Sequence, residues 1–449
     1  MKKVRFTTSQ IILFSFLAAI LLGSFLLALP VSWAEGQTVP YLDALFTATT
    51  SVCVTGLVTL PVAATWSLFG QAVILVLIQV GGLGVITVMS GLMLLLNRKF
   101  GIDDRLLIQD AFNLNTMAGL TKFIKQVLLG TLIVESAGAV LYMFVFVPQF
   151  GPKGIWISVF TAVSAFCNAG IDVIGESSLC GYAANPVINL VTAVLIILGG
   201  LGYIVWWDVL RVLKTRTKNN RKVFRYLTLH SKIAVTVTVG LIFAGMVLFL
   251  ALEHSNPMTL GKMPLDEKLQ AAFFQSVTTR TAGFASIPQE NLTDAAALVS
   301  VLLMMIGGSP VGTAGGMKTV TMAVLVCSAA ATVKNQNDAE LFGRRISTDS
   351  VRKAVAVAVM FLGICFASTV LLMAVSDAPA LDVIYETVSA TATVGLSRSL
   401  TAGLNTAGKW IIIATMYLGR VGPISLAVAL GSSQGRNIIA APTEEISIG

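Results

Sequence analysis

The chain has 449 residues, of which 55% are apolar and only 12% are charged, and its mean hydropathy is +0.84. A soluble core of this length needs far less apolar surface, so the composition excludes an ordinary soluble domain and indicates an integral membrane protein. The net charge of +8 must then be interpreted from where the charges lie along the chain.

Apolar runs of about 20 residues, long enough to cross about 30 Å of hydrocarbon, recur eight times. They cover residues 11–30, 68–96, 123–147, 186–210, 233–252, 295–333, 354–376 and 408–430. The first run follows the basic residues Lys2, Lys3 and Arg5, a pattern shared with cleaved signal peptides. Its length, and the repeat described below, favour a retained helix. We therefore expect an all-α membrane protein with eight spans.

The basic residues alternate between the two ends of these spans. Of the 30 Lys and Arg residues, 22 lie in the N-terminal tail, near residues 97–125, 211–232 and 334–353, and in the C-terminal tail. Six lie in the alternate loops and two within spans: Lys153, Lys262, Lys268, Arg280, Arg398 and Lys409, then Lys318 and Arg420. The positive-inside rule predicts that both termini and the three basic loops are cytoplasmic. Charges in such loops favour orientation, contact with anionic lipid or docking of a cytoplasmic partner over binding of nucleic acid.

Cysteine and histidine residues offer no site for a metal or for catalysis. The five cysteines are scattered, and the only histidines are His230 and His254. Neither a metal-ligand spacing nor a nucleophile with an adjacent base is present in the pattern. We expect this chain to be no enzyme and to bind no cofactor of its own.

Four glycines mark an internal repeat. Gly56, Gly170, Gly283 and Gly395 lie 114, 113 and 112 positions apart, and each follows an aromatic residue by ten positions. A near-constant period indicates four related units. Each unit is expected to contain a span, a short outer helix, a turn and a second span, with boundaries at 1–97, 98–212, 213–334 and 335–432 and a cytoplasmic tail at 433–449.

The segment before each glycine has the features of a pore loop. About eleven residues of Ser/Thr-rich helix are too short to cross the bilayer, so the segment is expected to dip in and return. Non-helical backbone at membrane depth is tolerated where it lines a watery cavity. Glycine lets successive carbonyls turn toward a common axis, where they replace the hydration shell of K⁺. A single glycine would merely suggest helix packing, but four equivalent ones favour a pore.

The predicted selectivity filter holds K⁺ on backbone carbonyls. Its residues are Val54, Thr55, Gly56, Asn168, Ala169, Gly170, Thr281, Ala282, Gly283, Thr393, Val394 and Gly395. The short helices are expected to begin near Asp43 and Asp382 and to direct the partial negative charge of their C-terminal ends at the cation. Other glycines, at 81–84 and 199–202, are expected to serve helix packing or bending.

The fourfold span, pore-loop, span arrangement around these glycines resembles the Trk/Ktr/HKT superfamily of potassium transporters, over essentially the whole chain. With the first repeat beginning near Met1 and a short tail after Arg436, it is most similar to the Ktr membrane subunit. The resemblance implies one pseudo-fourfold pore per protomer, a homodimer in the plasma membrane and a cytoplasmic nucleotide-binding ring that gates it. In plant relatives a serine at the first filter glycine accompanies Na⁺ preference, so Gly56 favours K⁺.

The third repeat departs from the others in its second span. Residues 306–319 carry five glycines and a proline, which no continuous helix tolerates. The resemblance implies that this segment is an intramembrane gate beneath the filter. The predicted gate residues are Gly312, Thr313, Ala314, Gly315, Gly316 and Lys318, together with Arg420.

Arg420 is predicted to lie in the pore below the filter, where it contacts the gate. It follows Gly395 by 24 residues, as Gly307 follows Gly283. A charge at this depth is costly unless it faces water or partners; the alternative is an interfacial arginine that extends to the cytoplasm. Asp172 and Glu176 are predicted to concentrate cations at the outer mouth, and Glu135 to be an ordinary buried hydrogen-bonding residue.

These features favour channel-like K⁺ uptake, with dependence on Na⁺ left open. The alternative is a secondary transporter that couples K⁺ to Na⁺ or H⁺, and a membrane enzyme is a distant third. Coupled carriers usually show inverted or twofold repeats, so the fourfold arrangement favours the first interpretation.

Overall fold

The computed structural model describes residues 7–96, 101–111, 119–175, 177–215, 223–336 and 338–422. Glu176, the end of the eighth expected span and the tail at 433–449 lie outside these ranges. Within them the protein is mostly helical with little strand, which confirms the all-α prediction. The strands described are one short antiparallel pair, β1 (Glu340–Leu341) and β2 (Arg344–Arg345).

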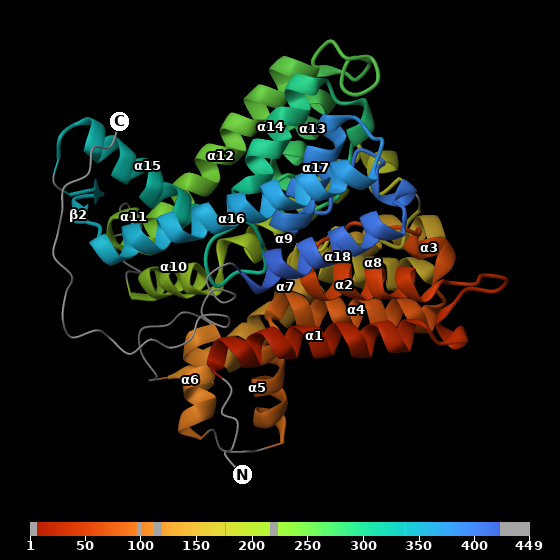
Figure 1. Cartoon of the computed structure of the whole chain (residues 1–449), viewed down its shortest axis with the longest axis horizontal. Helices are drawn as coiled ribbons and strands as arrows, with labels where there is room; N and C mark the ends of the chain where they lie inside the picture. Colours follow the sequence, from red (N-terminus) through yellow and green to blue (C-terminus); the bar gives the residue numbers. More distant parts are fainter. Residues whose placement is uncertain are drawn as a thin grey trace.

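Four long apolar helices each open one unit of the chain: α1 (Thr8–Leu27), α7 (Leu120–Phe150), α12 (Leu229–Glu253) and α16 (Thr348–Val375). All are long and apolar enough to cross a membrane. Their outer faces expose large side chains such as Phe144 and Phe366, 72% and 73% exposed, a surface that lipid would cover. Figure 1 shows α12 and α16 above α1 in the view.

Each long helix is followed by a short buried one: α2 (Tyr41–Cys53), α8 (Lys153–Cys167), α13 (Leu265–Thr278) and α17 (Ala380–Ala392). Several of their Ser and Thr hydroxyls donate to carbonyls of the same helix, as where Thr47 donates to the Asp43 carbonyl at 2.8 Å, which lets these polar helices be buried. Asp43 and Asp382 lie in the first turns of α2 and α17, as predicted.

The second helix of each unit is broken or ends early. The pairs α4 (Leu68–Leu83) with α5 (Val85–Leu95) and α9 (Pro186–Leu201) with α10 (Tyr203–Thr215) bend by 97° and 95°. In the third unit α14 (Asp294–Met305) and α15 (Thr319–Val333) are separated by a loop, and in the fourth α18 (Thr406–Val421) ends the described chain. The apolar runs at 68–96 and 186–210 therefore each form two helices joined by a sharp bend, at the glycines where packing or bending was expected, and the interruption of 295–333 is confirmed.

The breaks fall at equivalent glycines. Gly84, Gly202 and Gly422 have φ of +85°, +83° and +88°, a conformation that glycine adopts without steric cost. Sequence analysis expected an interruption only in the third unit and bending or packing at 81–84 and 199–202. The structure shows a break in the second helix of the first three units, and in the fourth α18 ends at Val421, next to the equivalent glycine Gly422.

Three residues before each of these breaks, a glycine packs against the short helix of its own unit. A methyl group on Gly81, Gly199 or Gly419 would lie 2.0, 2.0 or 2.1 Å from a backbone carbonyl oxygen. The second helices thus approach the short helices as closely as backbones allow, which is typical of small residues in membrane proteins.

The remaining elements lie between these helices, either within a unit or between units. They are α3 (Val62–Thr65), α6 (Ile102–Ala111), α11 (Val223–Tyr226) and the 3-10 turns Pro30–Ser32, Cys180–Tyr182, Gln289–Asn291 and Thr401–Gly403. Because α10 continues to Thr215, the boundary expected at 212 falls within a helix. Figure 1 shows α5 and α6 projecting beyond α1, away from the short helices.

Replacing Gly81 with Ala should destabilise the protein, because the added methyl would lie 2.0 Å from the Val52 carbonyl oxygen and overpacking costs about 1–3 kcal/mol. Gly363 is the matched control: it also lies within a helix, but a methyl there meets nothing within 4 Å. Thermal unfolding in detergent should show a lower midpoint temperature for Gly81→Ala than for the unmodified protein. The midpoint temperature of Gly363→Ala should be unchanged. Equal midpoints would contradict the close packing of α4 on α2.

Candidate functional site

Three of the four short helices end in the same way. The residue after each helix, Val54, Asn168 or Thr393, is left-handed, with φ of 55°, 60° and 51°. The following N–H then turns back and donates to a carbonyl five residues earlier, at 2.8 Å in each case. This hydrogen bond satisfies a carbonyl at the C-terminal end of the helix. The residue after the donor is the glycine of the repeat.

The four glycines meet in a closed ring, which we call the glycine ring (Gly56, Gly170, Gly283 and Gly395). All four have positive φ, from +66° to +102°. A methyl group on each would lie 2.2–2.7 Å from a carbonyl oxygen of the next unit in cyclic order; these oxygens belong, in turn, to Ala169, Ala282, Val394 and Thr55. The structure thus brings together four segments that lie more than 100 residues apart in sequence.

The chemistry presented by the ring is that of the backbone. The twelve residues predicted for the filter are buried, except for half-buried Gly395, and no side chain fits between neighbouring units at the glycines. Converging carbonyl oxygens are the ligands by which channels replace the hydration shell of a monovalent cation. The arrangement suits cation binding without acidic side chains.

Side-chain hydroxyl groups on the short helices accept hydrogen bonds from backbone N–H groups at the glycine ring. Thr50 accepts a hydrogen bond from the N–H of Gly56 at 3.0 Å, and Ser389 accepts one from the N–H of Gly395 at 3.0 Å. In the second unit Ser164 accepts from the N–H of Ile171 at 3.1 Å. Sequence analysis did not identify these side chains, although each lies six residues before its glycine.

The loop between α14 and α15, residues 306–318, is called the central loop. It is bound to the second unit by the N–H of Ser309, which donates to Gly200 at 2.7 Å, and by the N–H of Thr313, which donates to Gly199 at 3.1 Å. Within the loop the N–H of Gly307 donates to Met317 at 2.9 Å. A methyl group on Gly315 would lie 2.0 Å from the hydroxyl of Thr393, so the loop touches the end of the fourth short helix, next to the ring.

Arg420 joins the central loop to two other units. Its guanidinium donates to the Thr313 carbonyl at 2.8 Å and to the Gly81 carbonyl at 2.6 Å. Lys318 donates to the Ala314 carbonyl at 2.5 Å. Neither cation has a carboxylate within salt-bridge distance in the described part of the chain. Two positive charges therefore lie among backbone carbonyls of the loop, as the sequence predicted for Arg420.

Arg280, counted with the outer loops from sequence, is instead buried. It is 7% exposed and donates to the Gly307 carbonyl at 3.0 Å. Arg280 stands only three residues before Gly283, within the segment that was expected to dip into the membrane and return. The carbonyl oxygen offsets part of the cost of removing the charge from water.

Other acidic residues are engaged in local structure. Glu135 accepts a hydrogen bond from Gln79 at 3.1 Å, in keeping with its predicted role as a buried hydrogen-bonding residue. Asp172, predicted to attract cations at the mouth, accepts from the N–H of Ile174 at 3.1 Å. Glu386, which sequence analysis missed, is buried in α17 and accepts from the hydroxyls of Ser397 and Thr401.

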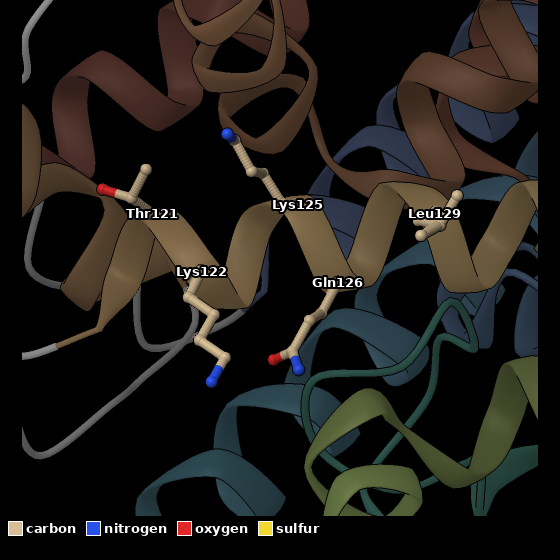
Figure 2. Close-up of a pocket in the computed structure, with 5 residues that line it drawn as sticks. All are labelled: Thr121, Lys122, Lys125, Gln126 and Leu129. Carbon is tan, nitrogen blue, oxygen red and sulfur yellow. The ribbon is translucent and has the colours of Figure 1, made fainter.

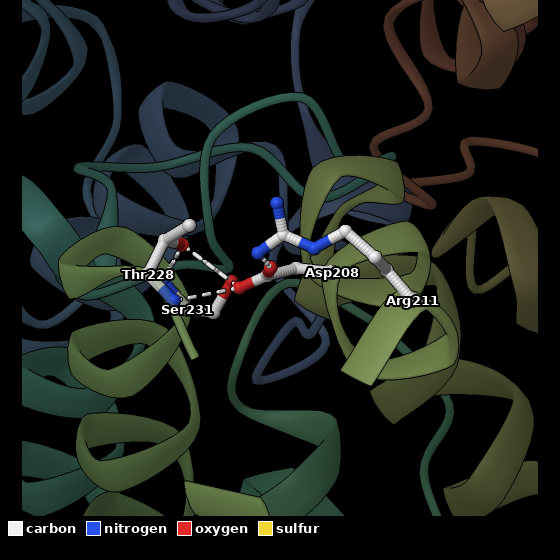
Figure 3. Close-up of polar contacts among 4 residues, drawn as sticks. All are labelled: Asp208, Arg211, Thr228 and Ser231. Carbon is white, nitrogen blue, oxygen red and sulfur yellow. Dashed lines mark hydrogen bonds and ion pairs between the residues drawn. The ribbon is translucent and has the colours of Figure 1, made fainter. Parts of the chain in front are cut away.

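The central loop is also linked to the long helix α12. Tyr203, at the start of α10, donates its N–H to the Val311 carbonyl at 3.0 Å. Further along α10, Asp208 accepts from the N–H and the hydroxyl of Thr228 at 2.8 and 2.9 Å and from Arg211 at 2.5 Å (Figure 3). Because Thr228 caps α12, the loop, α10 and α12 form one connected body.

Comparison with known proteins defines the class of this protein. The chain matches the family described as "TrkH: Cation transport protein" over residues 4–437, and it therefore belongs to this family of cation transporters, which are not enzymes. It is 39% identical to the potassium/sodium uptake protein NtpJ of Enterococcus hirae, over 95% of this chain and 93% of that protein. It is 37% identical to the Ktr system potassium uptake protein B of Bacillus subtilis, over 97% and 96%.

A solved structure shares the fold. The potassium transporter TrkH of Vibrio parahaemolyticus superposes with a TM-score of 0.76 at 16% identity, covering 96% of this chain and 86% of that one. Multi-pass membrane architecture and membership of the family are thus established together.

Replacing Thr50 with Val should leave the buried N–H of Gly56 without its acceptor, at a cost of about 1–3 kcal/mol. Thr47→Val is the matched control on the same helix, since that hydroxyl bonds only the Asp43 carbonyl. Thermal unfolding in detergent should show the larger loss for Thr50→Val. A larger loss for Thr47→Val would contradict the role given to the Thr50 hydroxyl.

Proposed function

We propose that this chain is the translocating subunit of a K⁺ uptake system and that K⁺ crosses the membrane through the glycine ring. The proposal is carried by the meeting of four positive-φ glycines with the carbonyls of neighbouring units. The uptake of potassium named for the relatives from E. hirae and B. subtilis supports the choice of ion.

The central loop is proposed to be the gate. It contacts the second, third and fourth units through hydrogen bonds or direct packing, and its carbonyls accept hydrogen bonds from Arg420 and Lys318. Positive charge on the path of a cation raises the electrostatic barrier to its passage. We therefore assign the loop in this arrangement to a non-conducting state.

The remaining parts of the proposal concern topology and assembly. At the start of α7, Lys122 and Lys125 line a shallow surface pocket with Thr121, Gln126 and Leu129. Figure 2 shows the two lysines on opposite sides of the helix. Such a basic helix end supports a cytoplasmic location, next to anionic lipid. By resemblance to Ktr systems, we propose a homodimer in the plasma membrane, with cytoplasmic termini and a cytoplasmic nucleotide-binding ring as regulator.

Replacing Gly56 with Ser should weaken discrimination between K⁺ and Na⁺. A side chain at φ of +102° is strained, and its Cβ would lie 2.5 Å from the Ala169 carbonyl oxygen, so the ring must deform. The ratio of ⁸⁶Rb⁺ to ²²Na⁺ uptake by proteoliposomes should fall by about tenfold, the change that corresponds to about 1.4 kcal/mol of selectivity.

Gly36→Ser is the matched control, because Gly36 has φ of +77° but no neighbour within 4 Å of an added Cβ. It shares the backbone strain without the contact to the ring. Equal selectivity in both variants and in the unmodified protein would exclude the glycine ring as the filter.

Replacing Arg420 with Gln should raise K⁺ uptake per folded protein with little change in selectivity. The substitution removes a charge and weakens the bonds to Thr313 and Gly81, and charge-assisted hydrogen bonds contribute about 1.5–3 kcal/mol. Arg420→Lys keeps the charge but loses the planar fork, so its uptake should be intermediate. If both variants fail to assemble and neither alters uptake per folded protein, Arg420 has only a structural role.

A further inference from the structure

The third segment of the ring contains a buried arginine that the other segments lack. Arg280 lies three residues before Gly283, and the equivalent positions hold Cys53, Cys167 and Ala392. Its side chain is buried with 7% exposure and has no carboxylate within salt-bridge distance among the residues the structure describes. A charge at this depth without an acidic partner is costly, so its contacts require an explanation.

The guanidinium connects three elements. It donates to the Gly307 carbonyl, at the start of the central loop, at 3.0 Å, and lies 3.4 Å from the hydroxyl of Thr238 on α12. Its Nε has no partner in the described chain. A cavity of about 10 Å³, lined by Arg280, Gly200 and Gly308 among others, lies beside it, with room for about one water.

The short helix before Arg280 also ends earlier, relative to its ring glycine, than the short helix of the first unit. Helix α13 ends at Thr278, five residues before Gly283, whereas α2 ends at Cys53, three residues before Gly56. Arg280 therefore follows the C-terminal end of α13 by two residues, and in this segment the guanidinium makes a direct bond to the central loop.

We propose that Arg280 is a positioning residue that ties the third segment of the glycine ring to the central loop and holds the loop in its non-conducting arrangement. This inference rests on the proposed K⁺ pathway and its gate. A charge-assisted hydrogen bond to a carbonyl is stronger than a neutral one, so loss of this tie shifts the loop toward the conducting arrangement.

The test measures K⁺ uptake per folded protein for Arg280→Met and Arg280→Lys. Met keeps a long apolar side chain but has no hydrogen-bond donor, so uptake should rise about tenfold, which is the shift in the loop equilibrium expected from the loss of one such bond. Lys keeps the charge, so its uptake should be intermediate. Lys268→Met is the matched control, since Lys268 is a buried cation on α13, the helix that precedes Arg280, and its Nζ donates to the His254 carbonyl at 3.0 Å, away from the loop. It should leave uptake unchanged.

A second comparison separates the tie from a general effect on the ring. Deleting residues 312–316 should by itself raise uptake, and Arg280→Met should then add nothing, because both changes act through the same contact. The proposal for Arg280 is overturned if Arg280→Met changes K⁺ uptake equally with and without the deletion. It is also overturned if Arg280→Met folds and does not change uptake. A deletion without effect refutes the gate itself, independently of Arg280. Should Arg280→Met fail to fold, Thr238→Val replaces it and is expected to raise uptake less.

Discussion

The convergence of non-helical backbone at the glycine ring is the constraint on which the rest of the structure depends. Backbone carbonyls at membrane depth need a partner, and at the ring those of four units crowd together with no side chain between them. Each feature around the ring follows from holding this arrangement in place. Side-chain hydroxyls accept hydrogen bonds from the N–H groups of the ring glycines Gly56 and Gly395. Glycines on the second helices let those helices pack in direct backbone contact with the short helices.

The backbone of the central loop also needs hydrogen-bond partners, and it finds them on neighbouring helices. Its proline and glycines cannot continue a helix, so its backbone groups are satisfied by α9, by α10 and by its own residues. Arg280, Lys318 and Arg420 each donate to a loop carbonyl. The same three cations would stabilise the loop and oppose passage of a cation, which makes the loop a point of control in the proposed pathway.

Much of this arrangement was predictable because the repeat is visible in the sequence. Four glycines at a constant period predicted the segments that meet at the ring, and the composition of 306–319 predicted an interrupted helix. The 24-residue offset shared by Arg420 and Gly307 predicted their common depth, and Arg420 indeed binds the loop.

The features that sequence reasoning missed depend on contacts between distant units. The glycines at 81–84 indicated helix packing or bending, but a run such as 68–96 is apolar throughout, so hydropathy did not predict that the bend at Gly84 would be as large as 97°. Arg280 was assigned to an outer loop because charge usually marks the membrane boundary. Its alignment with Cys53, Cys167 and Ala392 was the available signal, but the carbonyl that accommodates it belongs to a loop 27 residues away.

The most direct test of the pathway is an anomalous diffraction measurement on the full chain crystallised in Rb⁺. The account predicts a peak on the axis of the glycine ring, coordinated by carbonyl oxygens that include those of Thr55, Ala169, Ala282 and Val394. A protein that takes up Rb⁺ yet shows its ordered Rb⁺ elsewhere, with none at the ring, would contradict it.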